Sequence, residues 1–488
     1  MFAALTGGAA AALGHAPFHL WFVAVPGFAA IIWAVSVTPV PRRAFRNGWL
    51  AGSAYFAVTM HWIVEPFLVD AATHGWMAPG ALILLAGGLA LFWGLAAWLA
   101  RWLSTSPPAT AFSLALCLTA AELVRGHIFT GFPWAMPAYI WAETPLRMAV
   151  AFTGSYGLTA LTLVAAACLA IAQRHFWGPV VAVVLFGGLF IAGQARLNDG
   201  TPNETLGRVG LVHPNIPQTE KWVRDKVPGH IDRLLDLTGE NTTDPVDLIV
   251  WPEVAVVYPL DSAGGTLAAA SGAAGGTPVL LGINRREGED WYNSMVQIGA
   301  TGQVGEVYDK VHLVPFGEYI PFRLGFLRAM AATTSNGFSS GERVRLVETP
   351  LGRALPLICY EGIFPGHAFR AGERADYILL ITNDAWFGTF AGPFQHFDQA
   401  RFRAAEHGLP VVRVANAGLS GVIDRFGNAQ DTLGLTDIGY GAHPVRSGPP
   451  TLYARTGDLP LIFVLVLIGA VLLRVKRRKA IAKGTASV

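Results

Sequence analysis

Charged residues are scarce in this sequence of 488 residues. They make up 14% of the chain, against 52% hydrophobic residues, whereas soluble domains usually carry about 25% charged residues. Between Asn47 and Ala100 the only charged residues are Glu65 and Asp70, and no lysine precedes Lys221. This composition predicts an integral membrane protein rather than a soluble one.

Cofactor signatures are missing as well. The sequence contains no P-loop, no dinucleotide-binding fingerprint and no cluster of residues with metal-ligand spacing. His312, His396 and His407 are scattered along the chain, which favours structural roles over metal binding. We therefore expect no metal and no cofactor. The net charge of +2 gives no indication of a nucleic-acid partner, and we expect none.

The sequence contains long runs of apolar residues. A helix needs about 20 mostly apolar residues to cross a bilayer. Eight segments fit this description approximately, and they are 2–15, 18–37, 48–68, 78–104, 109–127, 148–173, 177–195 and 459–475. The first has no basic region of the kind that a cleaved signal peptide carries, because no Lys or Arg precedes Arg42. The sequence thus predicts a membrane domain over 1–196 with about seven helices, and one more helix within 457–488.

Basic residues beside these segments predict their orientation, because short cytoplasmic loops are enriched in Arg and Lys. With eight spans, all the flanking basic residues fall on the same side of the membrane as the N-terminus. They are Arg42, Arg43, Arg46, Arg101, Arg174, Arg474, Lys476, Arg477, Arg478 and Lys479. Both termini are then cytoplasmic, and segment 197–456 lies on the extracytoplasmic face.

Segment 197–456 consists of short apolar runs separated by turn residues. The runs predict strands at Gly207–Asn215, Val246–Glu253, Pro278–Asn284, Tyr292–Ile298, Gln303–Val307, Ala354–Cys359, Tyr377–Thr382, Pro410–Ala415 and Val422–Asp424. Helical patterns cover about 221–240 and 394–407. Strands that alternate with helices in this way predict an α/β domain with a two-layered sheet core.

Three of the predicted strands lead into residues that can carry chemistry: Glu253, Lys310 and Cys359. Cys359 is the only cysteine in this segment, since Cys117 and Cys168 lie in apolar spans. It has no internal disulfide partner there, so it is either an inert buried thiol or a reactive one. Each of the three residues alone is more often structural. Their occurrence together, each after a strand, favours a catalytic site.

The three side chains complement one another chemically. The thiolate is the nucleophilic form of cysteine, and a free thiol with a pKa of about 8.5 is mostly protonated at neutral pH. Glu253 is the best candidate for the base that removes the Cys359 proton. Lys310 can supply a fixed positive charge beside the oxyanion of a tetrahedral intermediate, and losing one such donor typically costs about 3–4 kcal/mol.

Wider motifs carry a family resemblance. Trp251-Pro252-Glu253, Lys310-Val311-His312-Leu313-Val314-Pro315-Phe316-Gly317-Glu318 and Cys359-Tyr360-Glu361 resemble the nitrilase, or carbon–nitrogen hydrolase, superfamily. Five further stretches extend the resemblance to the apolipoprotein N-acyltransferase family of bacteria. They are Glu122–Gly126, Thr130–Trp134, Asn383–Gly388, Gly392–His396 and Tyr453–Gly457. Val254 is a small departure, at a position where the family often has Ser or Thr.

This resemblance implies a nitrilase-like αββα sandwich joined to a polytopic membrane domain in a bacterial inner membrane. It also implies a reaction in two steps. A fatty acyl chain passes from a phospholipid, typically phosphatidylethanolamine, to Cys359 as a thioester. The chain then passes to the α-amino group of the S-diacylglyceryl cysteine of a lipoprotein. A catalytic site that opens at the bilayer surface would keep water from the thioester.

Further residues are candidates for supporting this chemistry. They are Glu318, Tyr360, Glu361, Trp222, Asn293, Trp386 and Arg125. The resemblance implies that the glutamate at 318 orients Lys310 or shares the role of base. The two residues after Cys359 either shape the site or support its loop. The two tryptophans and the asparagine either contact substrate or belong to the core. The arginine either forms an ion pair with Glu122 or contacts a lipid phosphate.

Two other functions use some of the same features. A membrane-tethered amidase or nitrilase that hydrolyses a small amide would share the triad, but it has no need of eight spans. A non-catalytic scaffold that binds lipids or lipoproteins would need the spans but not the triad. Amide hydrolysis without lipid would favour the first, and retained function in a Cys359→Ala variant would favour the second.

Overall fold

The computed structural model describes residues 1–201, 203–320 and 337–485, apart from the side chains of 242, 430 and 479–485. The side chain of Lys479, one of the basic residues predicted to be cytoplasmic, thus lies outside the described residues. The chain forms two compact units. A helical unit comprises Met1–Val64, Met77–Asp199 and Thr451–Val488, and a sheet unit comprises Glu65–Trp76 and Gly200–Pro450. The predicted boundary at 196 placed Glu65–Trp76 in the membrane domain, whereas this segment belongs to the sheet unit.

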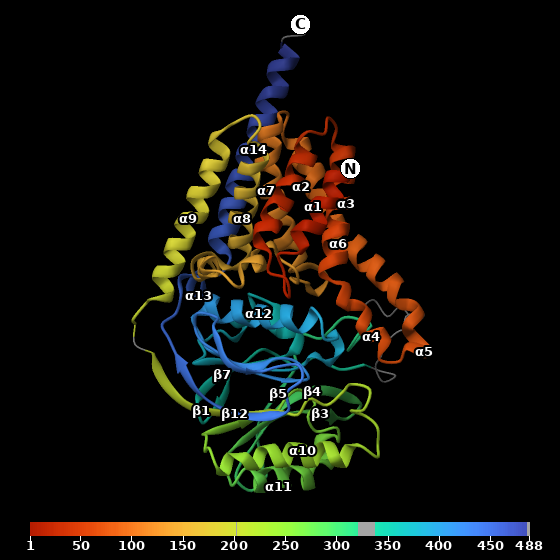
Figure 1. Cartoon of the computed structure of the whole chain (residues 1–488), viewed down its shortest axis with the longest axis vertical. Coiled ribbons are helices and arrows are strands. Elements are labelled where there is room, and N and C mark those ends of the chain that lie inside the picture. Colours follow the sequence, from red (N-terminus) through yellow and green to blue (C-terminus); the bar gives the residue numbers. More distant parts are fainter. Residues whose placement is uncertain (202, 321–336, 486–488) are drawn as a thin grey trace. The chain divides into compact units, whose positions relative to one another are not determined.

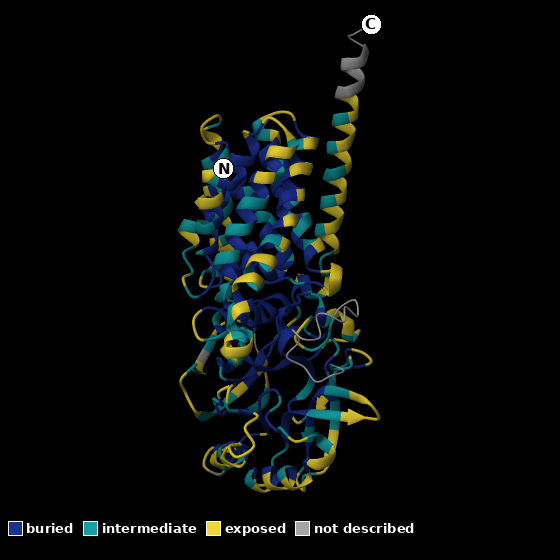
Figure 2. Cartoon of the chain, turned by 90° about the vertical axis from the view of Figure 1, so that its right-hand side faces the viewer, coloured by how far each residue is buried: buried dark blue, intermediate teal, exposed yellow. Residues whose placement is uncertain are grey.

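A helix overlaps each of the eight apolar ranges. These helices are α1 (Phe2–Ala12), α2 (Trp21–Ser36), α3 (Pro41–Thr59), α6 (Ala78–Leu103), α7 (Pro107–Arg125), α8 (Val150–Ala170), α9 (Trp177–Leu197) and α14 (Leu459–Thr485). Among the residues that the structure describes, five helical segments are long and apolar enough to cross a membrane, and they end in α6, α7, α8, α9 and α14. α1 and α2 are apolar but shorter. The apolar part of α14 has no buried residues, and Figure 2 shows the described side chains of this helix exposed or half-exposed.

α3 differs from its predicted range of 48–68. It begins earlier, at Pro41, because proline in the first helical turn has its φ already set and needs no hydrogen bond for its missing N–H. Arg42, Arg43 and Arg46 therefore lie on the first turns of a helix rather than in a loop. The helix also ends earlier, at Thr59, and a short 3-10 helix, His61–Val64, follows.

The sheet unit contains two six-stranded sheets, with strand orders β12-β1-β2-β3-β4-β5 and β11-β10-β9-β8-β7-β6. The strands of the first are β1 (Glu204–His213), β2 (Leu248–Val250), β3 (Val279–Glu287), β4 (Asp290–Ile298), β5 (Val304–Asp309) and β12 (Gly439–Ser447). Those of the second are β6 (Val347–Thr349), β7 (Gly352–Ile358), β8 (Tyr377–Asn383), β9 (Val411–Asn416), β10 (Ser420–Ile423) and β11 (Ala429–Leu433). The longer helices of the unit are α10 (Val227–Gly239), α11 (Gly264–Ala273) and α12 (Gly392–His407), and α4 (Glu65–Leu68) and α5 (Ala71–His74) are short.

Side chains alternate between two apolar cores along each strand, as the strand period of two requires. In β2, Leu248 and Val250 belong to a core shared with residues of the second sheet, while Ile249 packs with residues of α10 and α11. On the second sheet, Ile378 and Leu380 of β8 pack against α12. The unit is therefore a four-layered αββα sandwich, and Figure 1 shows α10 and α11 on one side of the sheets and α12 on the other.

The predicted strands correspond to β1–β5 and β7–β10, with small differences at their ends. β2 is shorter than predicted, because the chain turns away from the sheet after Val250. The helix expected at 221–240 begins only at Val227, since the residues before it form turns. β6, β11 and β12 were not predicted.

Candidate active site

The three predicted catalytic residues lie at the ends of three strands. Glu253 follows β2, Lys310 follows β5 directly, and Cys359 follows β7 directly. All are buried, with 6%, 1% and 8% of their surface exposed. The Lys310 Nζ lies 3.8 Å from the Glu253 Oε1. Both charges also act on the Cys359 thiol, so the structure brings the predicted triad together.

The loop of Glu253 depends on a glycine in the neighbouring strand. Val254 has a positive φ of 45°, which turns the chain sharply after the glutamate. This turn lies against Gly282 of β3, where a Cβ would lie 2.5 Å from the Val254 N and 2.6 Å from the Glu253 Cα. On the other side, the Lys221 Nζ donates a hydrogen bond to the Glu253 carbonyl oxygen at 3.2 Å. Glu253 is thus held in place through its backbone.

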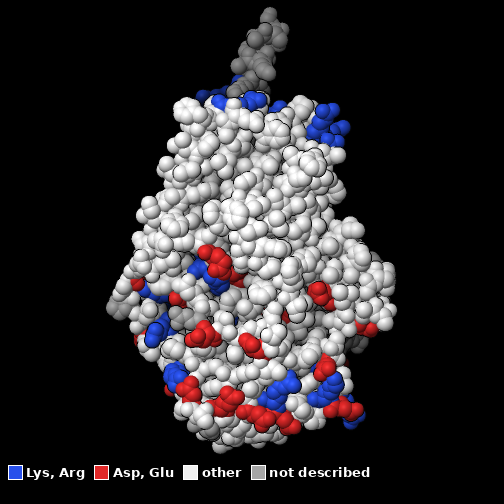
Figure 3. Space-filling view, viewed as in Figure 1, with Lys and Arg blue, Asp and Glu red and all other residues white. Residues whose placement is uncertain are grey.

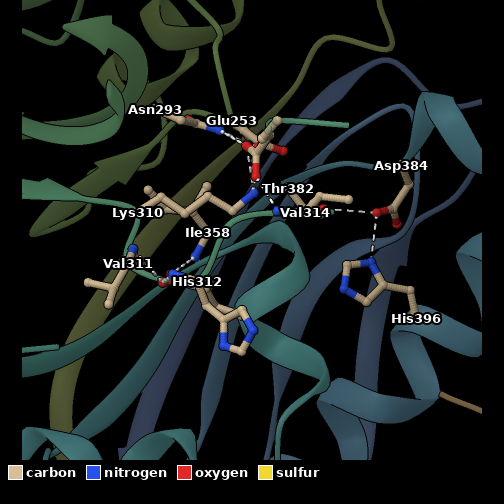
Figure 4. Close-up of polar contacts among 12 residues, drawn as sticks. Glu253, Asn293, Lys310, Val311, His312, Val314, Ile358, Thr382, Asp384 and His396 are labelled. Carbon is tan, nitrogen blue, oxygen red and sulfur yellow. Dashed lines mark hydrogen bonds and ion pairs between the residues drawn. The ribbon is translucent and has the colours of Figure 1, made fainter. Parts of the chain in front are cut away.

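Asn293 and Glu318 complete a network around the two charged residues, and Figure 4 shows Asn293 directed at Glu253. The Asn293 Nδ2 donates to the Glu253 Oε1 at 2.7 Å and to the Glu318 Oε1 at 3.1 Å. The Lys310 Nζ donates to the same Glu318 oxygen at 2.9 Å. The other Glu318 oxygen accepts from the Val314 N at 2.7 Å, which fixes the loop. Asn293, expected to contact substrate or to lie in the core, therefore bridges the two carboxylates.

The two carboxylates keep Lys310 charged. Burial on its own lowers the pKa of a lysine, but Glu318 and Glu253 more than compensate, and the pKa of Lys310 is raised. Its backbone N–H also donates to the Asn293 carbonyl oxygen at 2.9 Å. Lys310 is thus a permanent positive charge at a fixed position, which is what stabilising an oxyanion requires.

Cys359 sits at a sharp turn between β7 and a 3-10 helix, Cys359–Ile363. Its φ is +52°, a conformation that costs a residue other than glycine about 1–3 kcal/mol and is often found at active sites. Burial and the charge of Glu253 raise the pKa of the thiol, while Lys310 and a hydrogen bond with Thr382 lower it, and the net result is a raised pKa. The resting residue is therefore a neutral thiol that needs a base.

Glu361 ties the cysteine turn to the lysine loop. Its carboxylate is fully buried and accepts hydrogen bonds from the Ile358 N at 2.9 Å, the Val311 N at 2.8 Å and the His312 N at 3.0 Å. It is therefore a support of the loops, one of the two roles expected for it. Tyr360 is also buried, and its ring meets that of Phe364 edge to face.

The remaining candidates are less closely connected to the triad. Trp222 is 53% exposed and follows Lys221, and Trp386 is partly exposed in the 3-10 helix Asp384–Phe387. Among the described residues, no hydrogen bond joins either tryptophan to the triad. Arg125 belongs to the helical unit, where it is 2% exposed and forms an ion pair with Glu122. The structure thus favours the ion pair over a contact with a lipid phosphate.

Sequence reasoning missed two parts of the site. Lys221 was not predicted, although burial lowers its pKa to about 8 and it contacts the loop of Glu253. Thr382, at the end of β8, was not predicted either. The Asn-Asp sequence that follows it was a signal, because polar residues directly after a buried strand mark the end at which β7 carries the cysteine.

The sequence relatives of this chain agree with the two units. Residues 7–168 match the apolipoprotein N-acyltransferase N-terminal domain, and residues 208–432, which include the triad, match the carbon–nitrogen hydrolase family. An apolipoprotein N-acyltransferase from Rhodopseudomonas palustris is 36% identical over 97% of this chain and 95% of its own length. The chain belongs to the apolipoprotein N-acyltransferase family. A second member of this family, from Caulobacter vibrioides, is 35% identical over 97% of this chain and 94% of its own length.

Some solved structures are similar to about half of this chain. An amidase of the nitrilase superfamily from Nesterenkonia is 17% identical and covers 54% of this chain and 98% of its own, with a TM-score of 0.39. A score this low adds nothing to the assignment, which rests on the apolipoprotein N-acyltransferase relatives.

Proposed function

We propose that this chain transfers a fatty acyl chain from a phospholipid to the N-terminal amine of a diacylglyceryl lipoprotein, the final step of lipoprotein maturation. Family membership supports the reaction. The observation that carries the residue roles is the buried network in which Lys310 contacts two carboxylates beside the turn of Cys359. We assign Cys359 as nucleophile, Glu253 as base and Lys310 as oxyanion donor, with Glu318 and Asn293 holding the last two in place.

The first half-reaction moves the acyl chain to the enzyme. Glu253 takes the proton of the Cys359 thiol, and the thiolate attacks the ester carbonyl of the phospholipid. Lys310 stabilises the resulting oxyanion. The intermediate collapses to a thioester, and the departing alcohol of the lysophospholipid takes the proton from Glu253. Phosphatidylethanolamine is the proposed donor.

The second half-reaction passes the acyl chain to the lipoprotein. The α-amine attacks the thioester, Glu253 removes the proton of the amine, and the departing Cys359 thiolate takes this proton from Glu253. Lys310 again holds the oxyanion. The burial of all three residues supports transfer over hydrolysis, because a site that excludes water protects a reactive intermediate.

The proposed setting is a bacterial inner membrane, with eight spans, both termini in the cytoplasm and the sheet unit on the extracytoplasmic side. The surface of the helical unit supports it. In Figure 3 this surface is almost free of charged residues over most of its length, and Lys and Arg gather at one end. Such an end is typical of the cytoplasmic side.

The test uses the whole protein in vesicles of phosphatidylethanolamine with a labelled acyl chain. A diacylglyceryl-cysteinyl peptide with a free amine is added, and the same peptide with a blocked amine is the control. The proposal predicts that only the free amine gains a labelled acyl chain and that lysophospholipid is released in equal amount. Hydrolysis of small amides without acyl transfer would contradict it.

A further inference from the structure

A buried polar cluster lies beside the proposed nucleophile and has no role in the chemistry described so far. Its centre is Asp384, which follows β8. The Asp384 Oδ1 accepts hydrogen bonds from the Thr382 hydroxyl at 2.9 Å and from the His396 Nδ1 at 2.9 Å. The Asp384 Oδ2 accepts one from the Arg413 Nη2 at 2.6 Å. All four side chains are at most 1% exposed. Figure 4 shows Thr382 and His396 both directed at Asp384.

The sheet register places Thr382 beside Cys359. β7 and β8 are parallel neighbours, and Ile358 pairs with Ile381 in the last matched position. The next residue along the chain is Cys359 directly after β7 and Thr382 within β8, where Thr382 still pairs with Ala415 of β9, so the two lie at the same level. A side-chain hydrogen bond joins them. Thr382 therefore lies between the sulfur and Asp384.

The direction of these hydrogen bonds follows from the state of Asp384. Burial alone would raise its pKa, but Arg413 and His396 outweigh burial and lower it, so Asp384 is ionised. An ionised carboxylate can only accept hydrogen bonds, so the Thr382 hydroxyl must donate to it. The lone pairs of the hydroxyl then face Cys359, where they can accept the S–H of the resting thiol.

We propose that Thr382 is a further catalytic residue whose hydroxyl changes partner during the reaction: it accepts the S–H of resting Cys359 and donates to the sulfur once the thiolate forms. For the reaction the S–H turns from Thr382 to Glu253, the proton passes to Glu253, the S–H bond breaks and an O–H bond forms on the carboxylate, and Thr382 keeps its own proton throughout. Asp384 can release this hydrogen bond because it keeps the ion pair with Arg413 and the hydrogen bond with His396. The inference rests on the proposed role of Cys359 as nucleophile.

Alkylation of Cys359 by iodoacetamide tests this role without any lipid, so its outcome is independent of acyl transfer. The charged groups that act on the sulfur are Glu253, Lys310 and Asp384, and changing Thr382 removes none of them, although Asp384 loses one of its hydrogen-bond donors. Thr382→Val keeps the shape of the side chain but removes the hydroxyl. We expect it to move the midpoint of the alkylation pH profile upward by about one pH unit and to slow alkylation at neutral pH about tenfold, because a hydrogen bond to a charged group is lost.

Two variants separate the hydroxyl from packing. Thr382→Ser keeps the hydroxyl and should restore the rate to within about threefold of the wild type. Ser271→Ala removes another buried hydroxyl, which donates to the Gly299 carbonyl oxygen, and should leave the profile unchanged. If Thr382→Val does not fold, Thr382→Ala carries the same comparison. A Thr382→Val profile that matches the wild type, or a Thr382→Ser rate as low as that of Thr382→Val, would overturn the proposal.

Discussion

Glu361 shows how a single buried carboxylate can organise two loops of the site. Three backbone N–H groups, from Ile358, Val311 and His312, share its two oxygens. In Glu361→Gln one oxygen becomes an NH₂ group, which faces N–H donors instead of accepting from them. A buried donor without a partner costs about 1–3 kcal/mol. We expect Glu361→Gln to lower the free energy of unfolding by about this amount, as measured by denaturation of the detergent-solubilised protein.

Glu361 should also make the stability of the folded protein depend on pH. Burial raises the pKa of Glu361 from 4.5 to about 7, although the backbone N–H groups oppose this shift. The folded protein therefore binds this proton more tightly than the unfolded chain does. The stability that the proton contributes is complete below about pH 4.5 and is lost as the pH rises to about 7.

The glutamine side chain of Glu361→Gln cannot titrate. The difference in the free energy of unfolding between the wild type and this variant should therefore become smaller as the pH rises from 4.5 to 7. Melting temperatures at several pH values measure this difference. Glu287→Gln, at a side chain that is 70% exposed, is the control and should show no such change. If the stability difference between the wild type and Glu361→Gln does not change with pH, the raised pKa of Glu361 would be contradicted.

At the residue scale, the sequence predicts the triad because each member stands alone in a distinctive position after an apolar strand. Thr382 gives no such signal, since its role depends on the parallel register of β7 and β8. Asn293 lies inside a strand, and nothing in the sequence indicates which neighbours its amide would reach. Such contacts depend on which strands pair in the sheet. Local sequence patterns do not show this pairing when the strands are distant in the chain.

At the element scale, the turn after β2 can form only because the residue of β3 that lies against it, Gly282, has no side chain. A Cβ at Gly282 would meet backbone atoms of Val254, Glu253 and Pro252, none of which can move independently of the turn. We expect Gly282→Ala to displace Glu253 and to lower the rate of acyl transfer by about 10²-fold, since a shift of about 1 Å in a catalytic group can cost this much.

Gly229, in α10, is the matched control. A Cβ at this position meets nothing within 4 Å. Gly229→Ala should leave acyl transfer unchanged and should raise stability by about 0.4–1 kcal/mol, because alanine restricts the unfolded chain. A Gly282→Ala enzyme with the rate of Gly229→Ala would show that the turn does not depend on the glycine.

Strands with alternating apolar residues could be predicted, and those without them could not. β12 reads Gly-Tyr-Gly-Ala-His-Pro-Val-Arg-Ser, a pattern with few apolar residues. It forms because it pairs with β1 along the length of both strands, from Glu204 with Ser447 to His213 with Gly439. Tertiary pairing thus overrides a weak local preference.

At the scale of the whole molecule, the proposed topology predicts which positions a membrane-impermeant maleimide can reach. Glu289, with a side chain that is 92% exposed, lies in the sheet unit, and Arg43 is exposed on the first turn of α3. In a background that lacks Cys117 and Cys168, Glu289→Cys should label in intact spheroplasts. Arg43→Cys should label only after lysis. The reverse pattern would contradict the orientation.

The sequence also predicts the division into two parts, because charge and turn residues increase sharply after about 200. It does not predict that Glu65–Trp76 belongs to the sheet unit. This segment lies between apolar helices and looks like part of a span. In the structure α4 packs near the turn that contains Gly388, where a Cβ would lie 2.6 Å from the Glu65 carboxyl carbon.

The central claim is that Cys359 carries the acyl chain. The most direct measurement is the intact mass of the purified protein after incubation with phosphatidylethanolamine, with Cys359→Ala for comparison. The account predicts an increase of the size of a fatty acyl group in the wild type, removed by hydroxylamine and absent from Cys359→Ala. No increase when the lipid is bound, or an equal increase in Cys359→Ala, would contradict it.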